Sequence, residues 1–368
     1  MEDSVNMRKK SLCVLLVFAV LFCFAGCDVS TSSEPETSLV TTPSKSENDF
    51  SMSNNAYSNN LNAGIAVSDG EYLYYIGLGD SSGDYIGSSF DSEANLTVKR
   101  VRLDNLQGDG EVVVESGACN MFLSNTGMLY FASDEGITSA NVDNHISEVL
   151  LEYYDSEECG IMLQNEWIYS SYGFDGAGDD NFNGISRVNI STKTIEQVFN
   201  GENIGIDSYT FCIIGDIIYF RGSNADTEGI FTVSVNGGNP KLFYEGNISC
   251  FTATDDYIII SDFDESILVI PLNGNVPFSV GNVDSKLSSI NAFKENVFYV
   301  CDGNLFRTHI SDGTQEEIIN AREWGGKINY INIAGGKLVF LFQTTNGGNY
   351  ESGIYCADLD GNNAFCLK

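Results

Sequence analysis

The sequence predicts an all-β protein, and three features of the 368-residue chain indicate this fold class. Aromatic and β-branched residues gather in short runs that Gly, Asn and Asp separate, which is the pattern of strands and turns. Glycine is abundant, with 37 residues, and proline is scarce, with 5. In the body of the chain we find no segment with the 3.6-residue apolar period of an amphipathic helix. The chain is therefore expected to fold mainly as antiparallel sheet.

A β-hairpin repeats along the chain and predicts the architecture. One clear copy spans residues 211–220, where two apolar strands flank the turn Gly215-Asp216. The copies recur about every 40 residues with two insertions, and a period of that size is typical of repeat folds. A two-residue turn precedes the second strand of each copy. Seven copies align on the middle residue of this second strand, namely Tyr74, Tyr130, Tyr169, Tyr219, Ile259, Phe298 and Val339.

Two further strands follow in each copy, such as residues 230–235 and 241–244 of the clear copy. Four antiparallel strands in about 40 residues make one blade of a β-propeller, and a ring of blades leaves no long exposed edge. We expect seven four-stranded blades, and a six-bladed ring is the alternative. Because repeat folds grow as one body, a single propeller domain is expected over residues 62–368.

The N-terminus predicts export. Arg8-Lys9-Lys10 precedes an apolar run from Leu12 to Ala25, and a polar segment follows at once, which is the pattern of a secretory signal peptide over residues 1–26. A run of about 14 apolar residues is shorter than the roughly 18 to 20 that a membrane-spanning helix needs. The signal peptide is therefore preferred over a transmembrane anchor.

The residues around Cys27 predict lipid anchoring. Phe24-Ala25-Gly26-Cys27 resembles a bacterial lipobox, with Phe24 in place of the usual Leu. The resemblance implies cleavage before Cys27, a lipid on its thiol, and attachment to the extracytoplasmic face of the bacterial cell membrane. Residues 27–61 are rich in Ser, Thr and Asn and poor in apolar residues, so we expect a disordered tether after the lipidated cysteine.

The charge of the chain limits its partners. It carries 51 acidic and 18 basic residues, a net charge of −33 at pH 7. Nucleic acid and bare anionic lipid would be repelled. The expected partners are the membrane, reached through the lipid on Cys27, and a protein or carbohydrate ligand of unknown identity.

Most cysteines are expected to be free thiols. Seven of the ten remain after signal removal and lipidation, and an odd number argues against a full disulfide framework. If Asp360-Gly361-Asn362 forms a three-residue hairpin loop, Cys356 and Cys366 lie directly opposite each other across the last two strands, where a disulfide is the alternative to free thiols. Four others fall in the first strands of successive repeats, where a small buried side chain packs well, namely Cys119, Cys159, Cys212 and Cys250.

Motifs that carry chemistry are mostly missing. The only histidines, His145 and His309, cannot form a metal cluster by themselves. We find no nucleophile elbow, phosphate-binding loop or EF-hand. Residues 175–181 hold several carboxylates, but we interpret them as a solvated acidic loop rather than a calcium site. We therefore expect no cofactor, no metal and no catalytic residues.

Loop lengths predict the binding face. In an antiparallel blade the strand 1–2 and 3–4 turns share one face of the ring, here called the turn face. The strand 2–3 and 4–1 connections share the other, here called the loop face. The long connections all fall on the loop face, where binding usually resides. They carry aromatic residues that either stack on a ligand or pin their own loops, namely Tyr85, Phe90, Tyr153, Tyr154, Tyr172, Phe174, Phe182, Trp324 and Tyr350.

Two segments resemble a known family. Residues 67–75, Val-Ser-Asp-Gly-Glu-Tyr-Leu-Tyr-Tyr, and residues 305–313 resemble the bacterial lipoprotein propellers called domain of unknown function 5050. That family is similar to the propellers of low-density-lipoprotein receptors. The resemblance recurs weakly through residues 62–367. It implies the propeller fold and brings no established activity.

Three functions are compatible with these features. We favour a membrane-anchored lipoprotein whose propeller is a noncatalytic binding or protein-interaction module, because it requires no missing catalytic residues. The first alternative is a carbohydrate-active propeller enzyme that acts on wall or host glycans and pairs two carboxylates near the channel. The second alternative is a scaffold for envelope assembly.

Overall fold

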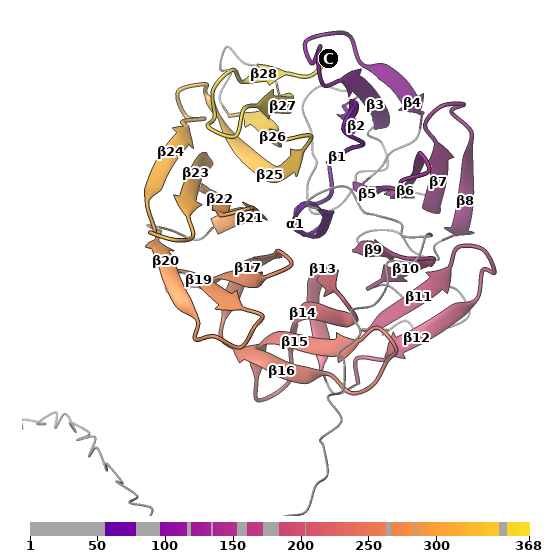
Figure 1. The fold of residues 1–368 in the computed structure, drawn as a ribbon, viewed down its shortest axis with the longest axis vertical. Helices are drawn as coiled ribbons and strands as arrows, with labels where there is room; N and C mark the ends of the chain where they lie inside the picture. The colour runs from indigo at the N-terminus through magenta and orange to yellow at the C-terminus, as the bar shows by residue number, and fades with distance from the viewer. Residues whose placement is uncertain are drawn as a thin grey trace, which may run out of the picture. The chain divides into compact units, whose positions relative to one another are not determined.

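Seven four-stranded antiparallel sheets surround a short helix, α1 (Ala56–Asn60), as Figure 1 shows. Each sheet consists of four strands that are consecutive in the chain, so the protein is a seven-bladed β-propeller. The predicted all-β fold and the count of seven blades are confirmed, and the six-bladed alternative is wrong. The computed structural model describes residues 56–78, 96–115, 119–133, 135–152, 160–171, 184–202, 204–262, 266–283, 285, 287–345 and 352–368.

Strands are numbered outward within each blade. Blade 1 contains β1 (Ala66–Ser68), β2 (Tyr72–Gly77), β3 (Thr97–Arg102) and β4 (Glu111–Val114). Blade 2 contains β5 (Cys119–Leu123), β6 (Met128–Ser133), β7 (Gly136–Asn141) and β8 (Ser147–Glu152). Blade 3 contains β9 (Ile161–Gln164), β10 (Trp167–Ser170), β11 (Ile185–Asn189) and β12 (Ile195–Phe199).

The remaining blades follow the same order. Blade 4 contains β13 (Gly205–Ile214), β14 (Ile217–Ser223), β15 (Glu228–Ser234) and β16 (Lys241–Glu245). Blade 5 contains β17 (Ile248–Ala253), β18 (Tyr257–Asp262), β19 (Ser266–Pro271) and β20 (Phe278–Asn282). Blade 6 contains β21 (Leu287–Phe293), β22 (Asn296–Cys301), β23 (Asn304–His309) and β24 (Gln315–Ile319). Blade 7 contains β25 (Gly326–Ala334), β26 (Lys337–Thr344), β27 (Gly353–Ala357) and β28 (Phe365–Cys366).

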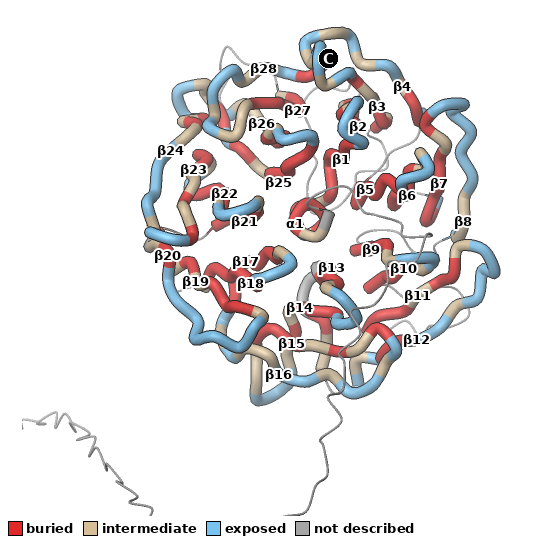
Figure 2. Tube along the Cα trace, in the orientation of Figure 1, coloured by how far each residue is buried: buried red, intermediate tan, exposed pale blue. Residues whose placement is uncertain are grey.

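The second strands form the middle of the core. Neighbouring blades cover both faces of these strands, so β2, β18 and β22 are runs of consecutive buried residues rather than alternating ones. The outer strands β8, β16 and β24 are largely exposed, as the blue rim in Figure 2 shows. The seven residues used to align the repeat all lie in second strands, and all are buried.

An arginine on the third strand ties three blades to the next blade. Arg100, Arg187 and Arg307 lie opposite the aligned residues Tyr74, Tyr169 and Phe298. Each Nε donates to a glutamate on the fourth strand, and one terminal nitrogen donates to a backbone carbonyl that follows the third strand of the next blade. We call this pattern the arginine staple. Its glutamates are Glu111, Glu196 and Glu316, and its carbonyls belong to Val142, Val235 and Leu359.

Replacing one staple should destabilise the ring measurably. Arg187 donates to Glu196 at 2.6 Å and to the Val235 carbonyl at 2.9 Å, and its side chain is 15% exposed. We expect Arg187→Lys to lower the free energy of unfolding by about 2 kcal/mol, because an ammonium cannot serve both acceptors in a fixed plane.

The measurement is denaturant unfolding, with Arg322→Ala as the matched control. Arg322 is 63% exposed and lies 3.3 Å from Asp302, so its loss should cost no more than about 1 kcal/mol. If Arg187→Lys and Arg322→Ala lower the free energy of unfolding equally, the staple does not stabilise the contact between neighbouring blades.

The register that would place Cys356 directly opposite Cys366 is wrong. The register places Cys356 opposite Phe365 and Tyr355 opposite Cys366. Because side chains alternate along a strand, the two cysteines point to opposite faces of the sheet. Neither is in a disulfide, and Cys356 is buried whereas Cys366 is exposed. Cys119 and Cys212 are buried and outside a disulfide, as predicted. Cys250 is also outside a disulfide but is half-buried rather than buried, and Cys159 lies outside the described residues.

The last residues of the predicted tether belong to the propeller. Residues 56–61 lie within the segment 27–61 that the sequence predicts as disordered, yet they form α1 and its first following turn at the centre of the ring. Residues 56–61 therefore belong to the propeller rather than to a disordered tether. Among the described residues, no helix is both long and apolar enough to cross a membrane.

Candidate functional site

Residues 57–65, here called the channel plug, fill the middle of the ring (Figure 1). Helix α1 gives way to a reverse turn in which the amides of Asn62 and Gly64 donate to the carbonyl of Asn59. Ala63 and Gly64 take positive φ angles of 64° and 51°. A side chain on Gly64 would place its Cβ 2.7 Å from the Cα of Asn120, so only glycine allows this close approach.

The plug forms hydrogen bonds with blades all around the channel. Ser58 donates to the carbonyl of Ala253 at 2.7 Å, and Asn60 donates to that of Ile161 at 2.6 Å. Tyr57 packs against the core cluster that contains Cys212 of blade 4, and burial raises the pKa of its hydroxyl to about 12. These contacts are buried, so they fix the plug in one position.

The contacts also give the direction of the plug. Inner strands run from the loop face to the turn face. Ser58 bonds to Ala253, the last residue of β17, whereas Asn60 bonds to Ile161, the first residue of β9. Helix α1 therefore runs from the turn face toward the loop face, and its N-terminal end points to the turn face.

The channel wall offers little charge. The seven innermost strands, as the structure delimits them, contain one acidic residue, Asp207, and one basic residue, Lys327. The plug meets them with amide, hydroxyl and backbone groups. These strands therefore cannot supply a pair of carboxylates to the channel.

An open hollow lies on the turn face, above blades 1 and 2. Its volume is about 830 Å³, and we call it the turn-face hollow. The 1–2 turns of blades 1, 2 and 7 border it, together with Phe293 of blade 6. Its charged and aromatic lining residues are Asp69, Glu71, Tyr72, Tyr74, Arg100, Asp143 and Phe293.

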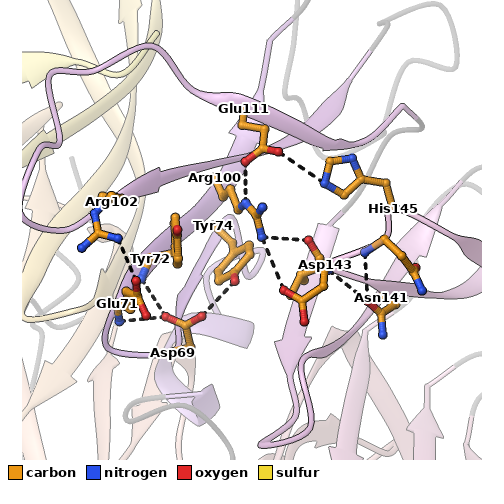
Figure 3. A network of polar contacts seen from close by, with 12 residues as sticks. Asp69, Glu71, Tyr72, Tyr74, Arg100, Arg102, Glu111, Asn141, Asp143 and His145 are labelled. Carbon is orange, nitrogen blue, oxygen red and sulfur yellow. Dashed lines mark hydrogen bonds and ion pairs between the residues drawn. The ribbon is translucent and has the colours of Figure 1, made fainter.

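Asp69 organises the blade 1 side of the hollow (Figure 3). One carboxylate oxygen accepts the backbone amides of Glu71 at 2.8 Å and Tyr72 at 2.7 Å, which closes the 1–2 turn. The other accepts the hydroxyl of Tyr74 at 2.8 Å. Burial raises the pKa of Tyr74, and its hydrogen bond to Asp69 raises it further, so the phenol stays a neutral donor.

Two arginines hold the aromatic ring of Tyr72. The guanidinium carbons of Arg100 and Arg102 lie 5.0 Å and 5.6 Å from its centroid, within range of a cation–π attraction. Arg102 also pairs with Glu71 at 2.8 Å. The hydrogen bond from Arg100 is the main cause that lowers the pKa of Glu111, with His145 3.5 Å away as a smaller cause. Figure 3 shows this network from Asp69 to His145.

The histidines do not meet. His145 follows β7 of blade 2, whereas His309 ends β23 of blade 6, where its ring lies beside the hydroxyl of Ser311. Among the described ranges, no group of three or more His, Cys, Asp or Glu side chains is arranged to hold a metal ion. The acidic segment 175–181 lies outside these ranges.

Of the predicted loop-face residues, the structure describes one. Trp324 lies in the connection between β24 and β25, with its ring 5.7 Å from that of Phe342 and 5.9 Å from that of Tyr355. It is half-buried against blade 7, as an aromatic that pins its own loop would be. The other eight lie outside the described residues, namely Tyr85, Phe90, Tyr153, Tyr154, Tyr172, Phe174, Phe182 and Tyr350.

The sequence patterns described above predict neither the plug nor the hollow. The hollow has a signal in the sequence, because Asp69, Glu71 and Tyr72 belong to the segment that carries the family resemblance. Asn59, Asn60 and Asn62 have none, because an asparagine-rich segment is equally typical of a disordered tether.

The pairing of Glu111 with Arg100 should make stability depend on pH. The folded-state pKa of Glu111 is lowered from its usual 4.5, so its contribution is fully present above pH 4.5 and is lost as the pH falls through the lowered value. We expect Glu111→Gln to be less stable than the wild type at pH 7, with the difference narrowing below pH 4.5.

Thermal unfolding across pH checks this, with Glu148→Gln as the control. Glu148 occupies the matching position of blade 2, where Ser139 lies opposite in place of an arginine. If the difference in stability between the wild type and Glu111→Gln at pH 7 does not narrow in acid, the pairing of Glu111 with Arg100 is not its cause.

Comparison with known proteins supports the fold alone. No protein-family model and no curated protein sequence matches the chain, so the resemblance to domain of unknown function 5050 stays a prediction. The chain is similar to the β-propeller domain of the Trilobed protease from Pyrococcus furiosus, described as having an open velcro topology. The TM-score is 0.54 at 13% identity, over 82% of this chain and 96% of that one.

Two solved lyases are similar to the same extent. An oligogalacturonate lyase from Vibrio parahaemolyticus has a TM-score of 0.54 at 13% identity, over 84% of this chain and 90% of that one. An oligogalacturonate lyase in complex with manganese has a TM-score of 0.53 at 11% identity, over 85% of this chain and 89% of that one. At such identities the likeness places the chain among β-propellers and carries no activity.

Proposed function

We propose that this protein is a membrane-anchored extracytoplasmic lipoprotein whose propeller is a noncatalytic binding or protein-interaction module. The observation that carries the proposal is the filled channel. A propeller glycosidase needs two carboxylates about 5 to 10 Å apart, and the alternative function would place them near the channel. Here the plug occupies that space, and Asp207 is the one acidic residue in the inner strands that the structure delimits.

The turn-face hollow is the site we propose for the ligand. Its wall contains three carboxylates, those of Asp69, Glu71 and Asp143, against one guanidinium, that of Arg100. Hydrogen bonds and ion pairs hold Asp69 and Glu71 in place without removing their charge. A site fixed in advance loses little conformational entropy on binding. This chemistry suits a cationic segment of a partner protein, which the net charge of −33 also attracts.

The loop face stays a competing location for the ligand. Its long connections and their aromatic residues predict binding there, and Tyr172 is representative of the residues outside the described ranges. Binding experiments with variants on both faces separate the two locations.

Anchoring through Cys27 rests on the sequence. The lipobox-like residues 24–27, the preceding signal peptide and the resemblance to lipoprotein propellers all support it. A lipid at Cys27 would leave the propeller on a tether of the residues up to 55, with a reach of roughly 30 Å.

Lipid labelling tests the anchor. In a bacterial host supplied with a radiolabelled fatty acid, we expect the wild-type chain to take up label and Cys27→Ala to take up none and keep its signal peptide, because only the thiol accepts the lipid. Cys366→Ala, which removes an exposed thiol elsewhere, is the control and should label normally. Label on Cys27→Ala would contradict the anchor.

Binding of a fluorescent hexalysine peptide tests the hollow. We expect the triple variant Asp69→Asn, Glu71→Gln and Asp143→Asn to weaken binding about tenfold, because each exposed charge pair contributes up to about 1 kcal/mol. Fluorescence anisotropy at physiological salt gives the dissociation constants.

The control removes the same charge from exposed positions elsewhere, with Asp226→Asn, Glu245→Gln and Asp256→Asn. Equal weakening by both triple variants would mean that only the overall field attracts the peptide. Weakening by Tyr172→Ala with none from the hollow variants would place the ligand on the loop face. Formation of an unsaturated product from oligogalacturonate by the wild-type protein would replace the noncatalytic proposal with the carbohydrate-active alternative.

A further inference from the structure

The junction between blades 7 and 1 differs from the other six. Every other pair of adjacent blades is joined by the chain itself, whereas blades 7 and 1 hold the two ends of the ring. Among the described strands, none is shared across this junction, because each sheet consists of four consecutive strands. As in blades 2, 4 and 5, the arginine staple is missing in blade 7, where Cys356 occupies the staple position opposite Val339, so no staple reinforces this junction. We call this junction the seam.

The outer part of the seam is held by a few contacts. The hydroxyl of Tyr75 donates to the carbonyl of Lys368, and the ammonium of Lys368 lies 3.7 Å from the carboxylate of Asp109. Apolar side chains of blade 7, such as Leu341 and Ile354, join the core cluster of blade 1. Similar apolar packing is present at the other junctions, so it does not replace the missing connection.

The inner end of the seam is held by the channel plug. Asn59 accepts the amide of Ile333 at 2.7 Å and donates to the carbonyl of Ile333 at 2.8 Å, so it pairs with blade 7 as a strand neighbour would. The same side-chain nitrogen lies 3.4 Å from the carbonyl of Ala66 in blade 1. One asparagine thus contacts both ends of the ring.

Asn332 completes the connection from the blade 7 side. Its oxygen accepts the amide of Ala66 at 3.1 Å, which is a direct hydrogen bond across the seam. Its nitrogen donates to the carbonyl of Asn62 in the plug at 2.9 Å. Asn59 and Asn332 are 2% and 0% exposed, so these bonds form away from water, where an unmade bond is costly.

We propose that residues 57–65 are the clasp that closes this propeller, in place of a strand shared between the first and last blades. Asn59 and Asn332 pair the two ends of the ring, while Ser58, Asn60 and Asn62 hold the clasp against blades 5, 3 and 6. Opening the ring at the seam requires that the plug leave the channel.

The clasp has a consequence for the proposed lipid anchor, and this step rests on the proposed function. The N-terminal end of the clasp is continuous with the segment that leads to Cys27. A pull on the anchor therefore reaches the clasp before it reaches any blade. Tension and ring closure are coupled through one short segment.

Hydrogen exchange on the full chain carrying Cys27→Ala tests the clasp without ligand or membrane. We expect Asn59→Ala to lower Tm by about 5 °C, since it leaves the Ile333 amide without its partner. Amide exchange should rise at least tenfold in β1, β2 and β25 to β27, while β14 and β15, on the far side of the ring, stay within about twofold.

Asn189→Ala is the matched control. Asn189 is also a buried asparagine, and its oxygen accepts the amides of Ser191 at 3.1 Å and Thr192 at 2.9 Å within one turn of blade 3. Its loss should lower Tm but raise exchange only in blade 3. If amide exchange in Asn59→Ala rises only in residues 57–66, or rises evenly over all blades, the proposal is overturned.

Asn62→Ala separates the clasp from direct damage to the seam. The side chain of Asn62 bonds to Ser58, Ile290 and Ser289, and none of these residues lies in blade 1 or blade 7. If the plug is the clasp, exchange rises at the seam strands of blades 7 and 1 although their own side chains are unchanged. A rise in blade 6 alone would show that the plug only fills the channel. Either result leaves the proposed binding function and anchor untouched.

Discussion

The constraint on which this structure depends is that both faces of each sheet must be covered. A blade with a second strand as apolar as β18, residues Tyr257–Asp262, cannot expose either face to water. Each blade therefore needs a neighbour on both sides, and a row of blades satisfies this only when its ends meet. Closing the ring is a condition for burying the core of blades 1 and 7, and the buried amides of Asn59 and Asn332 meet that condition where the chain provides no covalent connection.

Much of the fold could be predicted because its signals are local. Aromatic strands such as the one around Tyr219 are buried on both sides, so their apolar runs stand out between turns such as Gly215-Asp216. Seven such signals give seven blades. The cysteine register failed for a local reason too. The connection from Ala357 to Phe365 includes Asn363 with a positive φ of 55°, and it is longer than the predicted three-residue loop, which shifts the pairing by one residue.

The plug could not be predicted because its stability comes from distant partners. Asn59 bonds to Ile333, 274 residues away, and Asn60 bonds to Ile161, 101 residues away. Neither partner uses a side chain, so no complementary residue marks the contact in the sequence. The turn-face hollow is formed by local contacts, but a tight turn such as Asp69-Gly70 predicts only a connection between two strands. In the structure Asp69 closes its turn with one oxygen and holds Tyr74 with the other.

The position of the clasp at the beginning of the chain sets the order in which the molecule can be completed. Ala66 and Asn332 are separated by 266 residues, and a ribosome makes the first long before the second. The plug residues are therefore available from the start, but their partners in blades 5 to 7 arrive last. A chain that is still being made therefore has no means of closing its ring. Contacts of such long range form slowly, so the ring stays open until the last strands have folded. The core between blades 1 and 7 is the last part of the propeller to be buried.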